Sequence, residues 1–189
     1  MVKTVVFMVE GDCEKIFIEN HKAWLLSKFQ IELKSVINVG GGGNLCADSR
    51  LFDKFYKQAK SLNADHIMVL TDLECDPCIT KTKQRLNLEQ DCVLTVSRKA
   101  IESWFLADSN LMQQLTGDSA FHYANPEQTP EMPFDEIRKV LSQYGKRGTG
   151  PSKPQFIKRL FKQGFSIQSA LTHPNISSLH YFVNKLYNL

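Results

Sequence analysis

Carboxylates follow two separate apolar runs of the chain, and their positions indicate metal chemistry. An apolar run of five residues ends directly in Glu10, and a second run, 66–71, ends in an acidic triplet formed by Asp72, Glu74 and Asp76. If both runs are parallel strands of one sheet, their carboxyl ends lie beside the crevice where such folds bind ligands. Carboxylates gathered there would repel one another unless a cation neutralised them. The pattern therefore predicts a bound divalent metal and, with it, phosphate chemistry.

The spacing of the acidic residues suggests individual roles. Asp72 and Glu74 alternate and could reach one metal ion, with Asp76 either an outer ligand or a turn residue before Pro77. Glu14 is expected in the first turn of a helix, where a carboxylate is stabilised by the helix dipole even without a metal. Glu102 lies in an apolar segment, and helical spacing alone leaves open whether it faces solvent or the site.

The apolar patterns that position these residues predict an α/β fold. Strands are expected at 2–9, 31–39, 66–71 and 91–96. Helices are expected at 12–29, 47–62 and 79–87, with Asp12 as a helix N-cap. This alternation is typical of a Rossmann-like, mostly parallel four-stranded sheet flanked by helices. The glycines at 40–43 match no phosphate-binding motif and are interpreted as a flexible hinge.

The second half of the chain loses the strand pattern. Helices are expected at 98–107, 109–116, 134–144, 153–163 and 175–187. We therefore expect an α/β core at 1–108 and a helical, basic C-terminal extension at 109–189, which packs on the core to give a single compact unit.

Charge is distributed unevenly along the chain. Residues 137–189 contain nine Lys or Arg and no Asp or Glu, whereas residues 1–136 contain 14 basic and 20 acidic residues. A basic segment beside an acidic site suits a bound polyanion, although a solvated basic helix face is the alternative. The candidate nucleic-acid-binding residues are Lys146, Arg147, Lys158 and Arg159.

The remaining composition excludes several classes of protein. The five cysteines are an odd number and are expected to be thiols, because Cys75 and Cys78 lack the partner ligands of a zinc site. There is no G-x-S-x-G nucleophile motif and no apolar stretch long enough to span a bilayer. With no signal-peptide pattern at the N-terminus, a cytoplasmic location and no membrane partner are expected.

Together, these residues resemble the Toprim domain of topoisomerases, DnaG-type primases and OLD-family nucleases. The resemblance rests on Val9-Glu10-Gly11 and on Asp72-Leu73-Glu74. The segment 97–108, which contains Glu102-Ser103-Trp104-Phe105-Leu106, is similar to small bacterial Toprim-like proteins of the DUF4276 type, as is the tail from Lys153-Pro154 onward. Two positions depart from the pattern: Glu74 replaces the usual second Asp, and Ala100 replaces a Glu.

The resemblance implies a metal-dependent nuclease. Glu10 would be the general acid/base or a metal ligand, and Lys153 would steady phosphate charge in the transition state. The residues implied to bind Mg²⁺ or Mn²⁺ are Glu14, Asp72, Glu74 and Glu102. The substrate would be DNA or RNA, in phage defence or DNA repair, with a separate ATPase protein as a partner because this chain has no P-loop.

Other functions remain open at this point. A non-catalytic nucleic-acid-binding module would need the basic segment but no metal. A receiver-like phosphoacceptor domain or a small-molecule phosphatase would also use acids at strand ends. The oligomeric state is not predicted.

Overall fold

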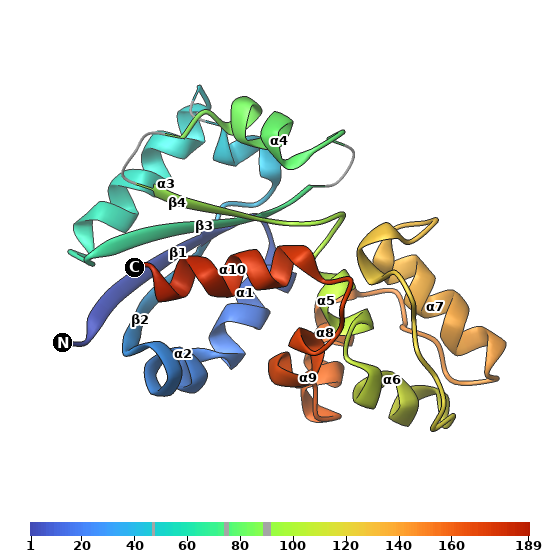
Figure 1. The fold of residues 1–189 in the computed structure, drawn as a ribbon. Helices are drawn as coiled ribbons and strands as arrows, with labels where there is room; N and C mark the ends of the chain where they lie inside the picture. Colours follow the sequence, from blue (N-terminus) through green and yellow to red (C-terminus); the bar gives the residue numbers. More distant parts are fainter. Residues whose placement is uncertain (47, 74–75, 89–91) are drawn as a thin grey trace. The chain divides into compact units, whose positions relative to one another are not determined.

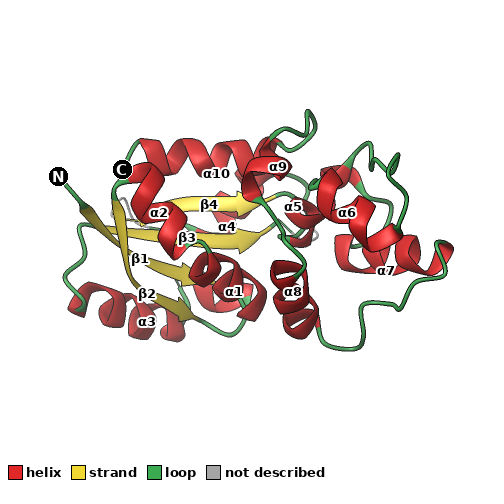
Figure 2. Ribbon diagram, turned by 90° about the horizontal axis from the view of Figure 1, so that it is seen from below, coloured by secondary structure: helices red, strands yellow, loops and turns green. Residues whose placement is uncertain are grey.

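The structure is a computed structural model that describes residues 1–46, 48–73, 76–88 and 92–189. Four strands form one sheet, in the order β2-β1-β3-β4. The strands are β1 (Lys3–Val9), β2 (Ile31–Asn38), β3 (His66–Asp72) and β4 (Cys92–Ser97). β1 pairs in parallel with both β2 and β3, and all four arrows in Figure 2 point the same way. The expected α/β fold is confirmed, with strand ends within one residue of their predicted positions.

Two of the helices predicted before residue 96 differ from their predictions: one is divided into two helices, and the other begins later. The predicted helix 12–29 is in fact α1 (Asp12–Asn20) and α2 (Lys22–Phe29), separated at His21, whose ring is buried and lies 2.8 Å from the Phe17 carbonyl oxygen. Gly11, not Asp12, is the N-cap of α1. In place of the predicted helix 47–62, the structure has α3 (Arg50–Ser61), which follows the 3₁₀ helix η1 (Gly42–Leu45). α3 begins at Arg50 because the Ser49 hydroxyl caps the helix by accepting a hydrogen bond from the Leu51 amide. α4 spans Ile79–Leu86, close to its prediction.

Helices cover both faces of the sheet (Figure 1). On one face, Val6 and Met8 of β1 pack in a cluster with Phe52 of α3 and Leu86 of α4. On the other face, the C-terminal helix α10 (Ser177–Tyr187) contributes Phe182, whose ring lies 6.3 Å from the rings of Phe7 and of Phe17. Alternate residues of β1 thus enter two different layers of core.

The chain divides into two compact units, Met1–Val96 with Tyr181–Leu189 and Ser97–His180. The second unit is helical and contains α5 (Glu102–Leu106), α6 (Ser109–Thr116), η2 (Pro126–Gln128), α7 (Pro133–Gln143), α8 (Lys153–Lys162), α9 (Ile167–Leu171) and the start of α10. α9 was not predicted. The second unit begins at Ser97, before the expected 108/109 boundary, because α5 packs against α6, α7 and α9 of that unit. The last residues of the chain, Tyr181–Leu189, belong to the first unit.

Within the described residues, no helix combines the length and the apolar character needed to cross a membrane.

Candidate functional site

The candidate site lies where the strand order changes direction. From β1 the chain crosses to β2 on one side and then to β3 on the other, so the carboxyl ends of β1 and β3 flank the switch point of the sheet. In open α/β sheets this is where ligands bind. Glu10 directly follows β1, and Asp72 is the last residue of β3. The strand ends predicted to carry acids are therefore neighbours.

Glu10 is held in place by β3. Its Oε2 accepts a 2.6 Å hydrogen bond from the Thr71 hydroxyl and lies 3.2 Å from the Asp72 amide nitrogen, which donates to it. Thr71 is completely buried, whereas Glu10 is only partly buried. One carboxylate oxygen is thus fixed by the protein at the edge of the sheet.

The glycine segment packs directly against this carboxylate. The Gly41 amide donates a 2.8 Å hydrogen bond to the Glu10 carbonyl oxygen. A Cβ atom added to Gly42 would lie 3.0 Å from Glu10 Oε1 and 3.1 Å from Glu10 Cδ, too close for an ordinary contact. The glycines interpreted as a hinge therefore include one whose lack of a side chain makes room for Glu10.

Alternation along the strands directs the two strand-end carboxylates to different faces of the sheet, so a single metal ion would meet both only beyond the carboxyl ends of β1 and β3. Glu10 meets Thr71, so it lies on the face that α3 and α4 cover. Side chains alternate along a strand, which directs Asp72 to the face that α1 covers. Glu14 of α1 is buried, and its Oε2 accepts a 2.9 Å hydrogen bond from the amide of the N-cap residue Gly11. Glu14 therefore has a helix-capping role, and its metal ligation stays a prediction.

Of the other two members of the acidic triplet, the structure describes Asp76 but not Glu74. Asp76 accepts a 3.0 Å hydrogen bond from Arg85 Nε and forms an ion pair at 3.0 Å with Arg85 Nη2. Its amide also donates to the Leu73 carbonyl oxygen, as in a turn. Among the described residues, no group of three or more His, Cys, Asp or Glu side chains is arranged to hold a metal ion.

Glu102 and Lys153 come together in the second unit. Glu102 is 2% exposed, so of the two orientations left open by the sequence, the solvent-facing one is wrong. Its Oε1 lies 3.7 Å from Lys153 Nζ, and its buried Oε2 has no hydrogen-bond partner among the described residues. A buried carboxylate with one unsatisfied oxygen is costly, which is typical of residues kept for function.

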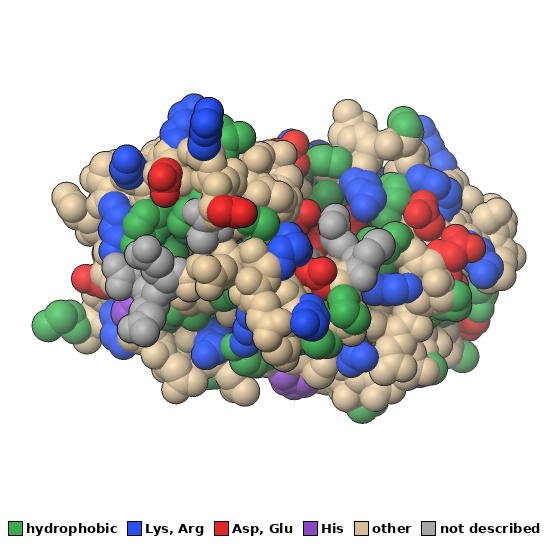
Figure 3. Space-filling model, turned by 90° about the horizontal axis from the view of Figure 1, so that it is seen from above, with side chains coloured by type: hydrophobic (Ala, Val, Ile, Leu, Met, Phe, Trp, Pro, Cys, Tyr) green, Lys and Arg blue, Asp and Glu red, His purple; other side chains and the backbone are tan. Residues whose placement is uncertain are grey.

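The four basic candidates differ from one another. Lys146, Arg147 and Lys158 are exposed. Arg159 instead donates a 3.0 Å hydrogen bond from Nη2 to the Gly148 carbonyl oxygen and lies 4.8 Å above the Phe156 ring. Arg159 therefore stabilises the second unit itself. Figure 3 shows Lys and Arg side chains interspersed with Asp and Glu over the face drawn, not gathered in one patch.

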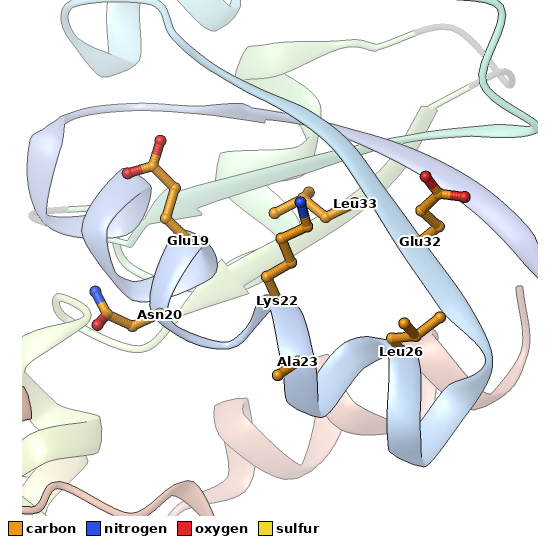
Figure 4. A pocket seen from close by; sticks show the side chains of 7 residues that line it. All are labelled: Glu19, Asn20, Lys22, Ala23, Leu26, Glu32 and Leu33. Carbon is orange, nitrogen blue, oxygen red and sulfur yellow. The ribbon is translucent and has the colours of Figure 1, made fainter.

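A pocket on the surface of the first unit lies away from this site. It has a volume of about 520 Å³ and lies between α1, α2 and the edge strand β2, with Lys22 projecting between Glu19 and Leu33 (Figure 4). Its lining carries both signs of charge and includes neither Glu10 nor Asp72. It therefore has no part in the candidate site.

The cysteines follow their prediction where they are described. Cys13, Cys46, Cys78 and Cys92 form no disulfide in the described part of the chain. Cys75 lies outside it.

Comparison with solved structures gives a similarity over nearly the whole chain. No protein-family model matches the chain, and no curated protein does. A solved structure, described as the C-terminal region of the Burkholderia pseudomallei OLD protein, aligns over 98% of this chain and 99% of its own, with 18% identity and a TM-score of 0.40. A similarity of this size says nothing about activity, and the resemblance to DUF4276 proteins stays a prediction.

Proposed function

We propose that this protein is a divalent-metal-dependent phosphodiesterase that cleaves nucleic acid. The observation that carries the proposal is the position of Glu10 at the switch point of the sheet, where Thr71 and the Asp72 amide hold one of its carboxylate oxygens. A carboxylate fixed at the ligand-binding edge, beside a second acid from the neighbouring strand, suits metal-assisted phosphate chemistry.

The donor set is compatible with Mg²⁺ or Mn²⁺. Magnesium is usually held by one or two carboxylates together with water and substrate phosphates. Glu10 Oε1 accepts no hydrogen bond from any residue that the structure describes, and Asp72 supplies the second carboxylate. Glu14, Glu74 and Glu102 are proposed as further ligands. Such an ion supplies polarisation of the phosphodiester and stabilisation of the leaving oxygen.

The protein's own side chains would divide the remaining work. Glu10, with Oε2 fixed by Thr71, would present Oε1 to a metal ion or to the proton of an attacking water. Lys153 would steady phosphate charge, and Lys146, Arg147 and Lys158 would hold the nucleic acid by its backbone. DNA or RNA as substrate, a role in phage defence or DNA repair, and a separate ATPase partner all belong to the same proposal.

A cleavage assay tests the proposal. Single- and double-stranded DNA and RNA are incubated with the protein in Mg²⁺, in Mn²⁺ and in EDTA. We expect metal-dependent cleavage that the double variant Glu10→Gln/Asp72→Asn abolishes. The matched control is Glu32→Gln/Asp53→Asn, which removes two exposed carboxylates away from the switch point. Cleavage that persists unchanged in the Glu10→Gln/Asp72→Asn variant would sink the proposal.

The main alternative gives a different result in the same experiment. A non-catalytic nucleic-acid-binding module would bind the substrates in EDTA, lose affinity steeply with added salt and cleave nothing in either metal.

A further inference from the structure

A basic pocket lies along the other edge of the sheet, at β4. It has a volume of about 330 Å³. Lys83 of α4 and Tyr181 and Lys185 of α10 line it, together with Leu88 and the β4 residues Cys92, Val93 and Leu94. All of these residues belong to the first unit.

Two ammonium groups converge on one tyrosine in this pocket. Lys83 Nζ donates a 3.2 Å hydrogen bond to the Tyr181 hydroxyl and lies 5.1 Å from the centre of its ring. Lys185 Nζ lies 5.3 Å from the same ring centre. Burial of Tyr181 raises the pKa of its hydroxyl, but Lys83 and Lys185 outweigh that effect and lower it. The tyrosine therefore lies in a positive local field.

No described residue of the lining neutralises these charges. The described lining contains two lysines, one tyrosine, one cysteine and three apolar side chains, and no Asp or Glu. Glu89 and Asp91 lie outside the described residues. Two like charges held near one hydroxyl repel each other, and a bound anion would relieve that repulsion.

We propose that this pocket binds a phosphate group, with Lys83 and Lys185 supplying the positive charge and the Tyr181 hydroxyl supplying a hydrogen bond. The assignment of that phosphate to a nucleic-acid backbone rests on the proposed function. The phosphate-binding chemistry itself rests on the pocket.

The pocket is separate from the candidate catalytic edge. Cys92, Val93 and Leu94 form the first half of β4, whereas Glu10 and Asp72 lie at the carboxyl ends of β1 and β3. In a parallel sheet, four residues of strand from Val93 to Ser97 correspond to about 13 Å. A phosphate bound in the pocket would therefore anchor a substrate and would not be the group that reacts at Glu10.

Binding of a fluorescein-labelled single-stranded oligonucleotide, followed by fluorescence anisotropy in EDTA, tests the proposal. The variant is Lys83→Met/Lys185→Met. The control is Lys28→Met/Lys57→Met, which removes two exposed lysines of the same unit outside the pocket. We expect the pocket variant to bind at least about fivefold more weakly than the control and to reduce the slope of log affinity against log salt by about 2. Tyr181→Phe, which keeps the ring, should weaken binding less.

Competition by inorganic phosphate and by a mononucleotide separates the two sources of phosphate. If these small anions compete in the wild type and in the control, but not in the pocket variant, the pocket binds the phosphate of free anions as well as that of the oligonucleotide. If the pocket variant matches the control for the oligonucleotide and for both small anions, with an unchanged circular-dichroism melt, the proposal is overturned. The anisotropy assay contains EDTA, which prevents metal-dependent cleavage, so it measures binding alone. If binding depends on Lys83 and Lys185 but the protein cleaves no substrate in Mg²⁺ or Mn²⁺, the proposed function is contradicted and the phosphate-binding pocket is not.

Discussion

The Thr71 hydroxyl donates a 2.6 Å hydrogen bond to Glu10 Oε2, so a completely buried residue of β3 orients the carboxylate that follows β1. A threonine is well suited to this position, since it is small enough to be fully buried and its hydroxyl reaches the neighbouring strand end. The two linked residues are 61 positions apart in sequence. It makes Thr71 a positioning residue for the proposed reaction.

Replacement of Thr71 by valine should therefore impair catalysis more than folding. Thr71→Val keeps the shape of the side chain but removes the shorter of the two hydrogen bonds to Glu10 Oε2, leaving only the 3.2 Å bond from the Asp72 amide. Loss of such an orienting contact typically lowers activity by about 10- to 100-fold. We expect the fall in kcat, with KM for the oligonucleotide unchanged. Thr71→Ser, which keeps the hydroxyl, should restore most of the activity. Equal activity in the valine and serine variants would exclude the positioning role.

Gly42 should be intolerant of a methyl group for a local reason. The added Cβ of Gly42→Ala would lie 3.0 Å from Glu10 Oε1 and displace the carboxylate. Gly43→Ala is the matched control, because no atom lies within 4 Å of its added Cβ. We expect activity to fall about tenfold or more in Gly42→Ala alone, with a stability change of about 1 kcal/mol or less in either variant by urea unfolding. Loss of activity in both variants would point to the loop backbone instead.

The sequence predicted the sheet well because its strands are short apolar or alternating segments that are separated by helical patterns. Glu10 and Asp72 could be placed at strand ends from that pattern alone. The contacts that organise them could not, since the Thr71–Glu10 bond depends on strand order and register, which periodicity does not encode. A threonine directly before Asp72 was the available signal, and it is too common to be diagnostic.

The second unit was harder to predict for a related reason. The burial of Glu102 and its approach to Lys153 depend on how α5 and α8 pack, and helical spacing left both faces of α5 open. The compact unit also begins at Ser97, because Trp104 and the other buried residues of α5 pack with later helices. Here tertiary contacts, not local pattern, determine the boundary.

Lys158 and Arg159 should respond differently to the same substitution. Lys158→Gln removes an exposed charge and should weaken nucleic-acid binding modestly, reducing the salt slope by about 1, while stability stays within about 0.5 kcal/mol. Arg159→Gln removes the hydrogen bond to Gly148 and the packing on Phe156, so it should destabilise the second unit by about 1–2 kcal/mol. Anisotropy titrations and urea unfolding measure the two effects. The reverse pattern would mean that Arg159 contacts the nucleic acid.

Lys153 and Glu102 should be energetically coupled. Lys153→Met leaves the buried Glu102 carboxylate without its 3.7 Å ion-pair partner, so it should destabilise the protein. Glu102→Gln/Lys153→Met should recover much of that loss, giving a coupling energy of about 1 kcal/mol because Lys153 is itself half exposed. A double-mutant cycle by urea unfolding measures it. Strictly additive effects would show that the ion pair contributes nothing to folding.

Acid should destabilise the first unit through His21. Burial lowers the pKa of His21 from 6.5 to about 4, with a partly opposing effect from the Phe17 carbonyl. Between these two values the unfolded chain binds a proton that the folded chain does not, so stability is retained above pH 6.5 and lost as pH falls toward 4. The full loss is roughly 3 kcal/mol, since each pKa unit corresponds to about 1.4 kcal/mol.

Urea unfolding at several pH values between 4 and 7 measures this dependence. His21→Gln should make the free energy of unfolding depend less on pH than in the wild type. His180→Gln, at an exposed position, should leave that dependence unchanged. Some slope should remain in His21→Gln, because burial also lowers the pKa of His173. A slope as steep in His21→Gln as in the wild type would mean that His21 is not the group whose protonation unfolds the protein.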